Sequence, residues 1–395
     1  MTKYAIIIPD GAADEPIEQF GQRTIFEASQ TSNIDRISTQ GRQGIVRTVP
    51  DGFEPGSDVA QMSLLGYDPS KFYSGRAPIE AVAQNIDLSP EDWVFRCNLV
   101  TAADGKMADH SAGHISTPEA TKLIKELNEQ LGNNRIRFYP GVSYRHLLVI
   151  KGMDFDVRTF PPHDHIGTAI DKLLPRGRGG DVLIDLIARS QQLFANHDIN
   201  KVRKDLGENQ VSSIWLWGHG RKAQMESFEK RFGVTGAAIT AVDLVRGLAK
   251  LIGFDIIDVP GATGFVDTNY EGKAEAAIKA LDSHDLVFVH VEAPDEAGHS
   301  GNAQMKKKAV ELIDKLIVGP VFEAIQNYES WRILVAPDHP TPVGTGAHSA
   351  EPVPFAMAGT NVSGILNTFF SEANAAKSGF RIENGFELME YFLKS

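Results

Sequence analysis

Cysteine and long apolar segments are nearly absent from this chain. The single cysteine, Cys97, cannot form an internal disulfide, which fits a reducing compartment. The N-terminal apolar run, Tyr4 to Ile8, is too short for a signal peptide, and no segment reaches the roughly 20 apolar residues of a membrane span. We therefore expect a soluble, cytoplasmic protein that does not enter a membrane.

Positive charge is also scarce. The formal net charge is −12, which argues against nucleic-acid binding and gives no attraction to anionic lipid. A phosphorylated substrate would therefore need a local cluster of arginine, lysine and metal. The phosphate-binding sequence G-x-x-x-x-G-K-[ST] is missing too, although Gly177 to Gly180 form a glycine-rich turn. Its absence lowers the prospect of a nucleotide-dependent kinase without excluding it.

The hydrophobic pattern divides the 395 residues into two regions with different orders of strands and helices. Strands and helices alternate in residues 1–85 and 218–395, which is typical of an α/β domain whose central, mostly parallel sheet is flanked by helices. Residues 86–217 instead contain paired strands and two helical stretches, 117–131 and 181–196. The sequence therefore predicts an α/β catalytic domain interrupted by a smaller inserted α+β domain.

Acids and imidazoles follow several of the predicted strands. They are Asp10, the pair Asp295 and His299, the pair Asp338 and His339, and His348 a turn later. Loops at the carboxyl ends of strands in an α/β sheet converge on one crevice, and these side chains are the ligand types that hold zinc or manganese. Each pair alone could be a solvated turn, and Asp10 could cap a helix. The joint pattern favours a metal site.

Ser57 is the candidate nucleophile. It lies at or near the amino end of a predicted helix in which Val59, Met62 and Leu65 share a face and which Gly66 ends. Serine is a favoured residue there for structural reasons alone. Beside a metal, however, a hydroxyl at the positive end of a helix would be an activated nucleophile for a phosphoryl group.

The candidate ligands divide into two sets. Paired divalent ions about 3.5–4 Å apart lower the pKa of a nucleophile and clamp a transferring phosphoryl group. We therefore expect one ion to be held by Asp10, Ser57, Asp338 and His339, and the other by Asp295, His299 and His348.

Longer segments of the chain are specific rather than generic. They include GSDVAQMSLLGYDP at 56–69, PGATGFVDTNYEGKAEAA at 260–277, HVEAPDEAGHSGN at 290–302 and APDHPTPVGTGAHSAEPVPF at 336–355. In these segments, and from end to end, the chain resembles the archaeal type of cofactor-independent phosphoglycerate mutases. That family belongs to the alkaline phosphatase superfamily of metalloenzymes.

The resemblance implies an alkaline-phosphatase-like core and a phosphoserine mechanism. Ser57 would take the phosphate of 3-phosphoglycerate and return it to the other hydroxyl as 2-phosphoglycerate, in glycolysis and gluconeogenesis. The family's two manganese ions match the two ligand sets residue by residue, zinc or magnesium being alternatives, and no 2,3-bisphosphoglycerate is needed. The insert would close over this small phosphorylated substrate and exclude the water that would turn a mutase into a phosphatase. The oligomeric state is left open.

The insert departs from the family's pattern. Where archaeal members have Asp-Arg-Arg-Ala-Gly-Arg, this chain has Asp-His-Ser-Ala-Gly-His at 109–114. Imidazole does not replace a bidentate guanidinium in carboxylate or phosphate recognition. The predicted substrate contacts are Asp109, His110 and His114, with Arg96, Arg145, Arg221 and Lys273 as compensating cations. For each of these cations a plain surface charge is the alternative.

Several functions are compatible with these residues. The leading one is a phosphoglycerate mutase. Forms with histidine in the insert resemble a bacterial branch for which a homoserine kinase role has been proposed, so a kinase-like phosphotransferase is a second hypothesis. A phosphomonoesterase or sulfatase of the same superfamily is a third. A metal-stabilised binding protein, in which Ser57 only caps its helix, is the alternative outside enzymes.

Overall fold

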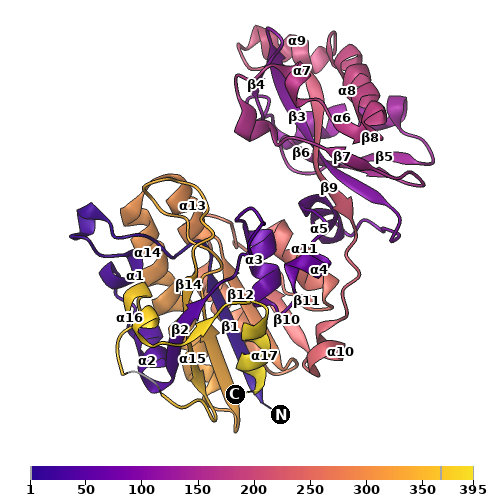
Figure 1. The fold of residues 1–395 in the computed structure, drawn as a ribbon. Coiled ribbons are helices and arrows are strands. Elements are labelled where there is room, and N and C mark those ends of the chain that lie inside the picture. The colour runs from indigo at the N-terminus through magenta and orange to yellow at the C-terminus, as the bar shows by residue number, and fades with distance from the viewer. Residues whose placement is uncertain (1, 365–366, 395) are drawn as a thin grey trace. The chain divides into compact units, whose positions relative to one another are not determined.

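The computed structural model describes residues 2–364 and 367–394. The chain divides into two compact units, unit 1 with Met1–Tyr73 and Met225–Ser395, and unit 2 with Ser74–Gln224 (Figure 1). These boundaries differ from the 85/86 and 217/218 expected from the sequence. The reason is that helix α5 (Arg76–Ala83) packs on β3 (Trp93–Ala103) and β9 (Ser213–Arg221), so the helix and the end of β9 belong to the smaller unit.

An eight-stranded sheet forms the centre of unit 1, within the described residues. Its strands, in spatial order, are β11 (Asp255–Ile256), β10 (Gly236–Ile239), β12 (Leu286–Val291), β1 (Lys3–Pro9), β13 (Trp331–Val335), β14 (Val353–Gly359), β2 (Arg42–Val46) and β15 (Arg381–Ile382). Only β14 runs antiparallel to its neighbours. The predicted mostly parallel α/β sheet is therefore confirmed.

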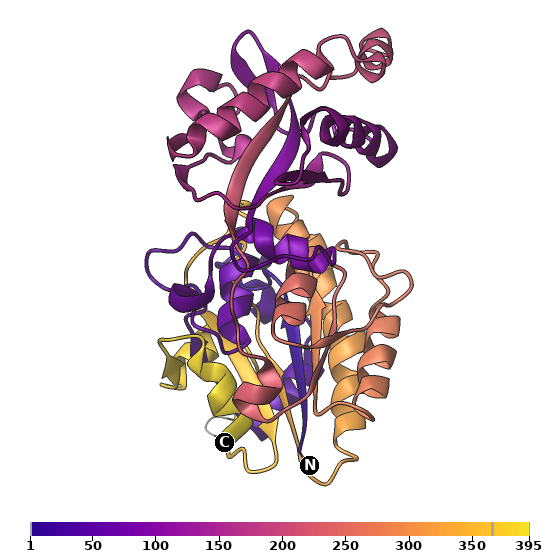
Figure 2. The same cartoon turned by 90° about the vertical axis from the view of Figure 1, so that its right-hand side faces the viewer.

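Helices cover both faces of this sheet. On one face, Ala5 and Ile7 of β1 share an apolar core with α2 (Ser32–Gln40), α12 (Tyr270–Ala280), α14 (Ala303–Ile313) and α15 (Gly319–Ile325). The other face carries α3 (Ser57–Leu64), α11 (Asp243–Leu251) and α17 (Glu387–Lys394), with α3 in contact with the other two (Figure 2). Burial on both faces explains why β1 reads as a continuous apolar run instead of an alternating one.

Unit 2 is built on an antiparallel sheet. Its strands run in the order β4 (Lys106–Asp109), β3, β6 (Arg145–Ile150) and β5 (Ile136–Tyr139), and β9 pairs with β3. Helices α6 (Thr117–Leu131) and α8 (Gly180–Phe194) pack on the sheet through an apolar core of their own. Segregated strands and helices of this kind confirm the predicted α+β character of the insert.

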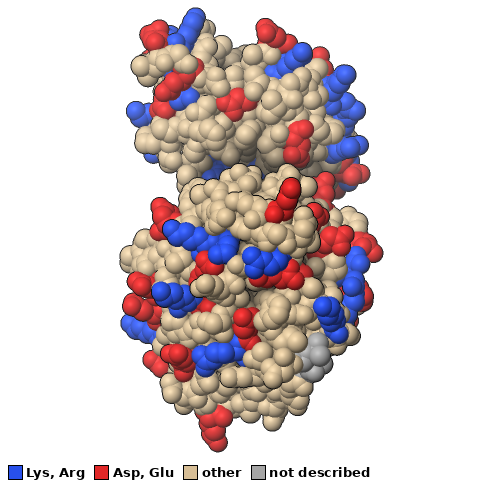
Figure 3. All heavy atoms as spheres, turned by 90° about the vertical axis from the view of Figure 1, so that its left-hand side faces the viewer, with Lys and Arg blue, Asp and Glu red and all other residues tan. Residues whose placement is uncertain are grey.

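Surface charge is mixed in sign. On the face drawn in Figure 3, lysine and arginine side chains are interspersed with aspartate and glutamate. Within residues 2–364 and 367–394, no helix has both the length and the apolar character that crossing a membrane requires.

His146 in β6 is expected to make unit 2 sensitive to acid. Its side chain is 2% exposed, its Nδ1 accepts a hydrogen bond from the backbone N–H of Gly141, and burial lowers its pKa to about 3. Below the unfolded pKa of about 6.5 the unfolded chain binds the proton first, so stability falls as the pH drops from there towards 3. We expect a loss on the order of 2 kcal/mol by about pH 4.5.

This prediction is checked by urea denaturation at a series of pH values, on the wild type and His146→Gln. Glutamine fills similar space but does not titrate. The difference in unfolding free energy between the two should therefore narrow as the pH falls below about 6.5. An unchanged difference between neutral pH and about pH 4.5 would contradict the assignment.

Candidate active site

The first predicted ligand set meets at the carboxyl edge of the unit 1 sheet. Asp10 directly follows β1, and Asp338 and His339 follow the neighbouring parallel strand β13. All three side chains are fully buried. Nε2 of His339 lies 3.5 Å from Oδ1 of Asp10 and 3.5 Å from Oδ2 of Asp338. Neighbouring parallel strands end at the same edge, which is why residues more than three hundred positions apart converge.

Ser57 faces this set. It is the first residue of α3, and Gly56 occupies the N-cap position without a side-chain capping hydrogen bond. Oγ of Ser57 lies 3.1 Å from Nε2 of His339. The hydroxyl is therefore directed at the ligand set, and helix capping does not account for this serine.

The second set lies on α13 (Ala293–His299), the short helix that follows β12, and on the loop after β13. Asp295 and His299 are four residues apart, so they project from one face of the helix, with 3.2 Å between Oδ2 and Nε2. Nε2 of His348 lies 2.9 Å from Nε2 of His299 and 3.5 Å from Oδ1 of Asp295. The surface-turn interpretation of this pair is therefore wrong.

The two sets adjoin each other. The ring centroids of His339 and His348 are 4.2 Å apart. Thr341 also connects them, because its hydroxyl donates to Oδ1 of Asp295 and lies 3.3 Å from Nδ1 of His339. The seven predicted metal ligands, Ser57 included, thus form one continuous cluster.

Burial and neighbouring charges shift the pKa values of the aspartates in opposite directions in the two sets. Burial, followed by the charge of Asp338, raises the pKa of Asp10 well above its ordinary value. Burial acts in the same direction on Asp295, but the hydrogen bonds from His299 and His348 outweigh it and bring the pKa of Asp295 well below normal. The hydrogen bond to Asp295 in turn raises the pKa of His299 to about 9. The first set therefore holds carboxylates that repel each other and require a cation or a proton between them.

Both sets have the composition and spacing of metal sites. Oδ1 of Asp10 is buried and has no hydrogen-bond partner among the described residues, as expected for an oxygen that binds an ion. Carboxylate oxygen together with imidazole nitrogen is a donor set for manganese or zinc. Ligand atoms lie within 4.8 Å of one another in each of the two groups, Asp10, Asp338 and His339, and Asp295, His299 and His348.

Sequence reasoning missed two polar residues at the end of β12. Nε2 of His290 lies 2.6 Å from Oδ2 of Asp10, and 3.7 Å from Oε2 of Glu292. The available signal was the alternation in His-Val-Glu, because residues two apart at a strand end point to the same face.

Lys306, a buried lysine that contacts the segments next to the cluster, was not predicted from the sequence either. Nζ of Lys306, on α14, donates to Oδ2 of Asp14 at 2.7 Å and to the carbonyl oxygens of Ala13 and Thr341 at 3.1 and 2.8 Å. Its side chain has no exposed surface. Lys306 thereby joins the segment after β1 to the loop that carries Asp338 and His339.

Three of the predicted substrate contacts in unit 2 surround Tyr144. The ring centroids of His110 and His114 lie 5.5 and 6.0 Å from that of Tyr144, and the guanidinium of Arg145 lies 5.5 Å from the same ring. The structure therefore brings two imidazoles and a guanidinium to one aromatic side chain.

Arg96 adjoins a second aromatic side chain in unit 2. Its guanidinium lies 4.4 Å from the ring of Trp217, and its Nε is 3.1 Å from a carboxylate oxygen of Glu80. His163, which sequence reasoning did not select, packs its ring 5.2 Å from Trp217 and 6.1 Å from His110. The function of these residues as substrate contacts stays a prediction.

The other predicted substrate contacts have structural partners. Asp109 accepts hydrogen bonds from two backbone N–H groups of the turn that follows β4. Arg221 donates to Asp154 at 2.8 Å. Lys273, on α12, is 1% exposed and donates to the carbonyl oxygen of His290 at 2.9 Å. Each side chain is thus already held by protein groups.

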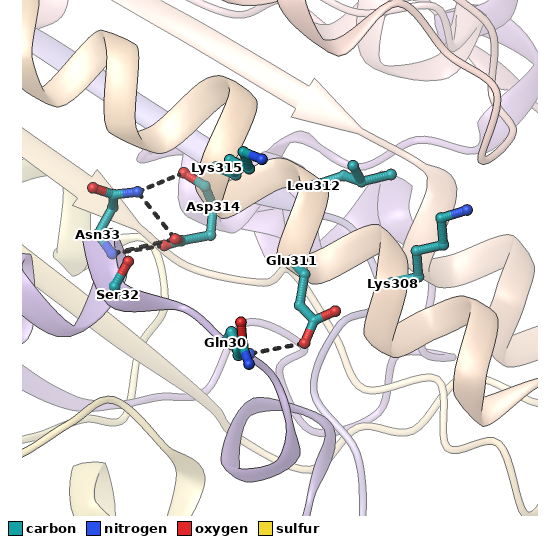
Figure 4. Close-up of a pocket in the computed structure, with 8 residues that line it drawn as sticks. All are labelled: Gln30, Ser32, Asn33, Lys308, Glu311, Leu312, Asp314 and Lys315. Atoms are coloured by element: carbon teal, nitrogen blue, oxygen red, sulfur yellow. Dashed lines mark hydrogen bonds between the residues drawn. The ribbon is translucent and has the colours of Figure 1, made fainter.

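A surface pocket of about 340 Å³ in unit 1 contains none of the predicted site residues (Figure 4). Its carboxylate Asp314 accepts hydrogen bonds from the backbone N–H and the side-chain amide of Asn33, each at 3.1 Å, and so fixes the start of α2. The lining residues are Gln30, Ser32, Asn33, Lys308, Glu311, Leu312, Asp314 and Lys315.

The fold and the site together indicate a class of α/β enzymes. In this class, carboxylate and imidazole side chains and a serine hydroxyl meet at the carboxyl edge of a mostly parallel sheet. The comparisons with known proteins narrow this class. The family model for 2,3-bisphosphoglycerate-independent phosphoglycerate mutase matches residues 38–200. A Methanosarcina mazei protein with that name is 49% identical over 379 residues, which cover 95% of this chain and 96% of the relative.

Two solved structures share the fold over the whole length. A Pyrococcus horikoshii protein has a TM-score of 0.85 and 27% identity, covering 99% of this chain and 96% of its own. The cofactor-independent phosphoglycerate mutase of Thermoplasma acidophilum has a TM-score of 0.68 and 27% identity, covering 100% and 99%. The chain belongs to the 2,3-bisphosphoglycerate-independent phosphoglycerate mutase family, which confirms the family expected from the sequence.

Proposed function

We propose that this protein is a phosphoglycerate mutase that interconverts 3-phosphoglycerate and 2-phosphoglycerate through a phosphoserine at Ser57. Family membership supports the reaction. The observation that carries the mechanism is the position of Ser57 Oγ, 3.1 Å from Nε2 of His339 and not engaged in capping its helix. A hydroxyl beside buried carboxylates and imidazoles is the arrangement that covalent phosphoryl transfer requires.

The two ligand sets are proposed to hold two divalent ions, with manganese as the expected metal. One set would be Asp10, Ser57, Asp338 and His339, and the other Asp295, His299 and His348. When bound, such ions lower the pKa of the serine hydroxyl and neutralise phosphoryl oxygens. No 2,3-bisphosphoglycerate enters this scheme, because the phosphate is held on Ser57 itself.

The transfer proceeds in two balanced steps. Oγ of Ser57 gives up its proton and forms a bond to phosphorus while the bond from phosphorus to the C3 oxygen breaks, and the C3 oxygen takes up a proton. The C2 hydroxyl then gives up its proton, and its oxygen forms a bond to the same phosphorus while the bond from phosphorus to Oγ breaks. Oγ takes up a proton, which regenerates Ser57 with no net gain or loss of protons. Ser57 lies at the amino end of α3. The free backbone N–H groups there favour the negative charge that develops on the phosphoryl group.

Unit 2 is proposed to act as the substrate-capping part of the enzyme. Arg145 beside Tyr144 and Arg96 beside Trp217 carry the positive charge that the carboxylate and phosphate of a phosphoglycerate require, and the histidine rings next to them offer N–H donors. If unit 2 excludes water during the transfer, water cannot hydrolyse the phosphoserine. The enzyme then acts as a mutase and not as a phosphatase.

A comparison of three substrates on one manganese-loaded preparation tests this proposal. We expect 3-phosphoglycerate to be converted to 2-phosphoglycerate without added 2,3-bisphosphoglycerate, as followed by phosphorus NMR from either direction. Homoserine with ATP, and a simple phosphate monoester with water as acceptor, should react at least about 100-fold more slowly, because neither returns the phosphoryl group to the same bound glycerate. Faster phosphorylation of homoserine, or faster hydrolysis, would replace the proposal.

A further inference from the structure

The turn that carries His110 and His114 has a strained backbone. Ala112 and His114 have φ angles of +49° and +50°, and Gly113 between them has a φ of +67°. Residues other than glycine rarely adopt this left-handed conformation, because Cβ crowds the following carbonyl oxygen. Strain of this kind persists only where the surrounding structure enforces it, and it is concentrated at functional sites. A neighbouring group must therefore hold residues 112–114 in this conformation.

Arg203, on α9 (Asp198–Asp205), contacts this turn from inside unit 2. It is 2% exposed, and its Nη2 donates to the carbonyl oxygen of Ala112 at 2.7 Å. Its Nη1 lies 3.1 Å from a carboxylate oxygen of Glu119 and 3.0 Å from one of Glu208. These carboxylates balance a charge that would otherwise be costly to bury. The guanidinium is thus held in place, and it fixes the carbonyl group that it contacts.

Asn209 gives the turn a second connection to Arg203. Nε of Arg203 donates to the carbonyl oxygen of Asn209 at 2.9 Å, and the side-chain amide of Asn209 donates to Oδ2 of Asp109 at 2.7 Å. The same Oδ2 accepts the backbone N–H of Gly113 at 2.6 Å. A Cβ added at Gly113 would lie 3.2 Å from Nη2 of Arg203, so the guanidinium packs directly against the turn. Arg203 therefore supports residues 112–114 at two points.

The conformation of the turn determines where two imidazole rings lie. The ring centroid of His114, the last left-handed residue, lies 6.0 Å from that of Tyr144 and 6.5 Å from that of His110. Tyr144 follows Ser143, which also has a left-handed φ, +54°. The hydroxyl of Ser143 donates to the carbonyl oxygen of Ile115 at 2.7 Å, directly after the turn. The strained residues are thus connected to one another around the ring of Tyr144.

We propose that Arg203 is a positioning residue for phosphoglycerate, which it does not touch itself. By holding the carbonyl oxygen of Ala112, it keeps the rings of His110 and His114 in place to donate hydrogen bonds to the carboxylate or phosphate group of the substrate. Donors that are already fixed lose less conformational freedom on binding than mobile ones, so the affinity is higher. This inference rests on the proposed function, because it takes a phosphoglycerate as the anion that these histidines bind.

Arg203→Met tests the positioning role in the full-length, manganese-loaded enzyme. We expect KM for 3-phosphoglycerate to rise at least about tenfold while kcat changes less than about threefold, because the contacts of the two histidines act on the substrate and the transition state alike. An unchanged KM in the folded variant would overturn the proposal.

Ser190→Ala is the matched control for lost stability. Ser190 lies on α8 of the same unit, is fully buried, and its Oγ accepts the backbone N–H of Ile214 at 3.0 Å, a hydrogen bond that does not involve the turn. This variant should unfold at a lower urea concentration and keep KM within about twofold of the wild type. An equal rise of KM in both variants would assign the effect to lost stability and overturn the proposal.

Histidine NMR signals give a readout that does not depend on turnover. The ring C–H signals of His110 and His114, assigned through His110→Gln and His114→Gln, should shift when 3-phosphoglycerate is added to the wild type. Arg203→Met should need at least about tenfold more ligand for the same shift. Zinc replaces manganese in these samples, because paramagnetic manganese would broaden the signals.

The outcomes separate this inference from the proposed function. Histidine signals that do not respond in the wild type, while 3-phosphoglycerate is still converted to 2-phosphoglycerate, would overturn the positioning role and leave the reaction intact. If the wild type does not convert 3-phosphoglycerate at all, the proposed function fails and this inference fails with it.

Asn209→Ala covers the case in which Arg203→Met does not fold. Asn209 is exposed, so its substitution leaves the core of unit 2 intact and removes only the donor to Asp109. KM should rise about threefold in this variant with kcat unchanged, because one of the two supports of the turn is lost. An unchanged KM, together with unchanged shifts of the two histidine signals, would overturn the proposal.

Discussion

Ser57→Ala is expected to reduce mutase turnover by roughly 10⁴-fold or more, because alanine offers no oxygen to receive the phosphoryl group. Metal content must be measured on the same sample, since Ser57 is also a proposed ligand of one ion. The phosphoserine itself can be trapped by acid quenching of the wild type during turnover. Mass spectrometry of the peptide that contains Ser57 should then show one added phosphoryl group, which the variant lacks.

A second serine of the same helix provides the matched control. Ser63 lies on α3, is fully buried, and its Oγ has no hydrogen-bond partner among the described residues. Ser63→Ala removes a hydroxyl of the same kind away from the ligand sets, so turnover should stay within about threefold of the wild type. Turnover that survives in Ser57→Ala while the metal remains bound would eliminate the nucleophile assignment.

The candidate metal ligands could be predicted because their geometry follows from a general rule. Asp10, Asp295 and Asp338 all lie just beyond parallel strands, and the carboxyl ends of such strands meet at one edge whatever the order of the strands. The order itself, and the reversed direction of β14, depend on contacts between distant segments, and no local pattern encodes them. The convergence of these three aspartates was therefore more predictable than the strand order of the sheet that carries them.

Residues that act through long-range contacts could not be predicted. Lys306 falls in a helical stretch with several other lysines, and its spacing alone does not distinguish a surface charge from a buried one. Lys273 was expected to face the substrate, yet it is buried beneath His290. For these two lysines the partner is set by tertiary packing. Asp109, whose role as a substrate contact stays a prediction, holds the turn after β4 through neighbours that lie two and four residues further along the chain.

Lys306→Met is expected to destabilise unit 1 by about 3–5 kcal/mol, because it leaves a buried carboxylate without its counter-charge. The side chains of Lys306 and Asp14 are 0% and 1% exposed, and their atoms are 2.7 Å apart. Methionine keeps most of the side-chain volume, so the cost comes chiefly from the charge and the three lost hydrogen bonds. Urea denaturation of the wild type and the variant measures this difference in the free energy of unfolding.

The adjacent lysine supplies the control for this substitution. Lys307 pairs with Glu311 at 2.6 Å, but both side chains are more than a quarter exposed, at 26% and 28%. Water screens such a pair, so Lys307→Met should cost less than about 1 kcal/mol. A double variant that also carries Asp14→Asn should recover part of the loss of Lys306→Met, because the uncompensated charge is gone. Equal costs for the two lysine variants would contradict the buried-pair argument.

The effect of Lys306→Met should extend beyond stability to metal affinity. Lys306 holds the carbonyl oxygen of Thr341, whose hydroxyl in turn donates to Asp295, so the loop between the two ligand sets loses its anchor in the variant. Outer hydrogen-bond partners of metal ligands typically change metal affinity by about 10–100-fold when they are removed. Manganese binding to the folded variant, measured well below its denaturation midpoint, should weaken by that factor. A core lysine that contributes only to folding would lower the midpoint and leave the affinity unchanged.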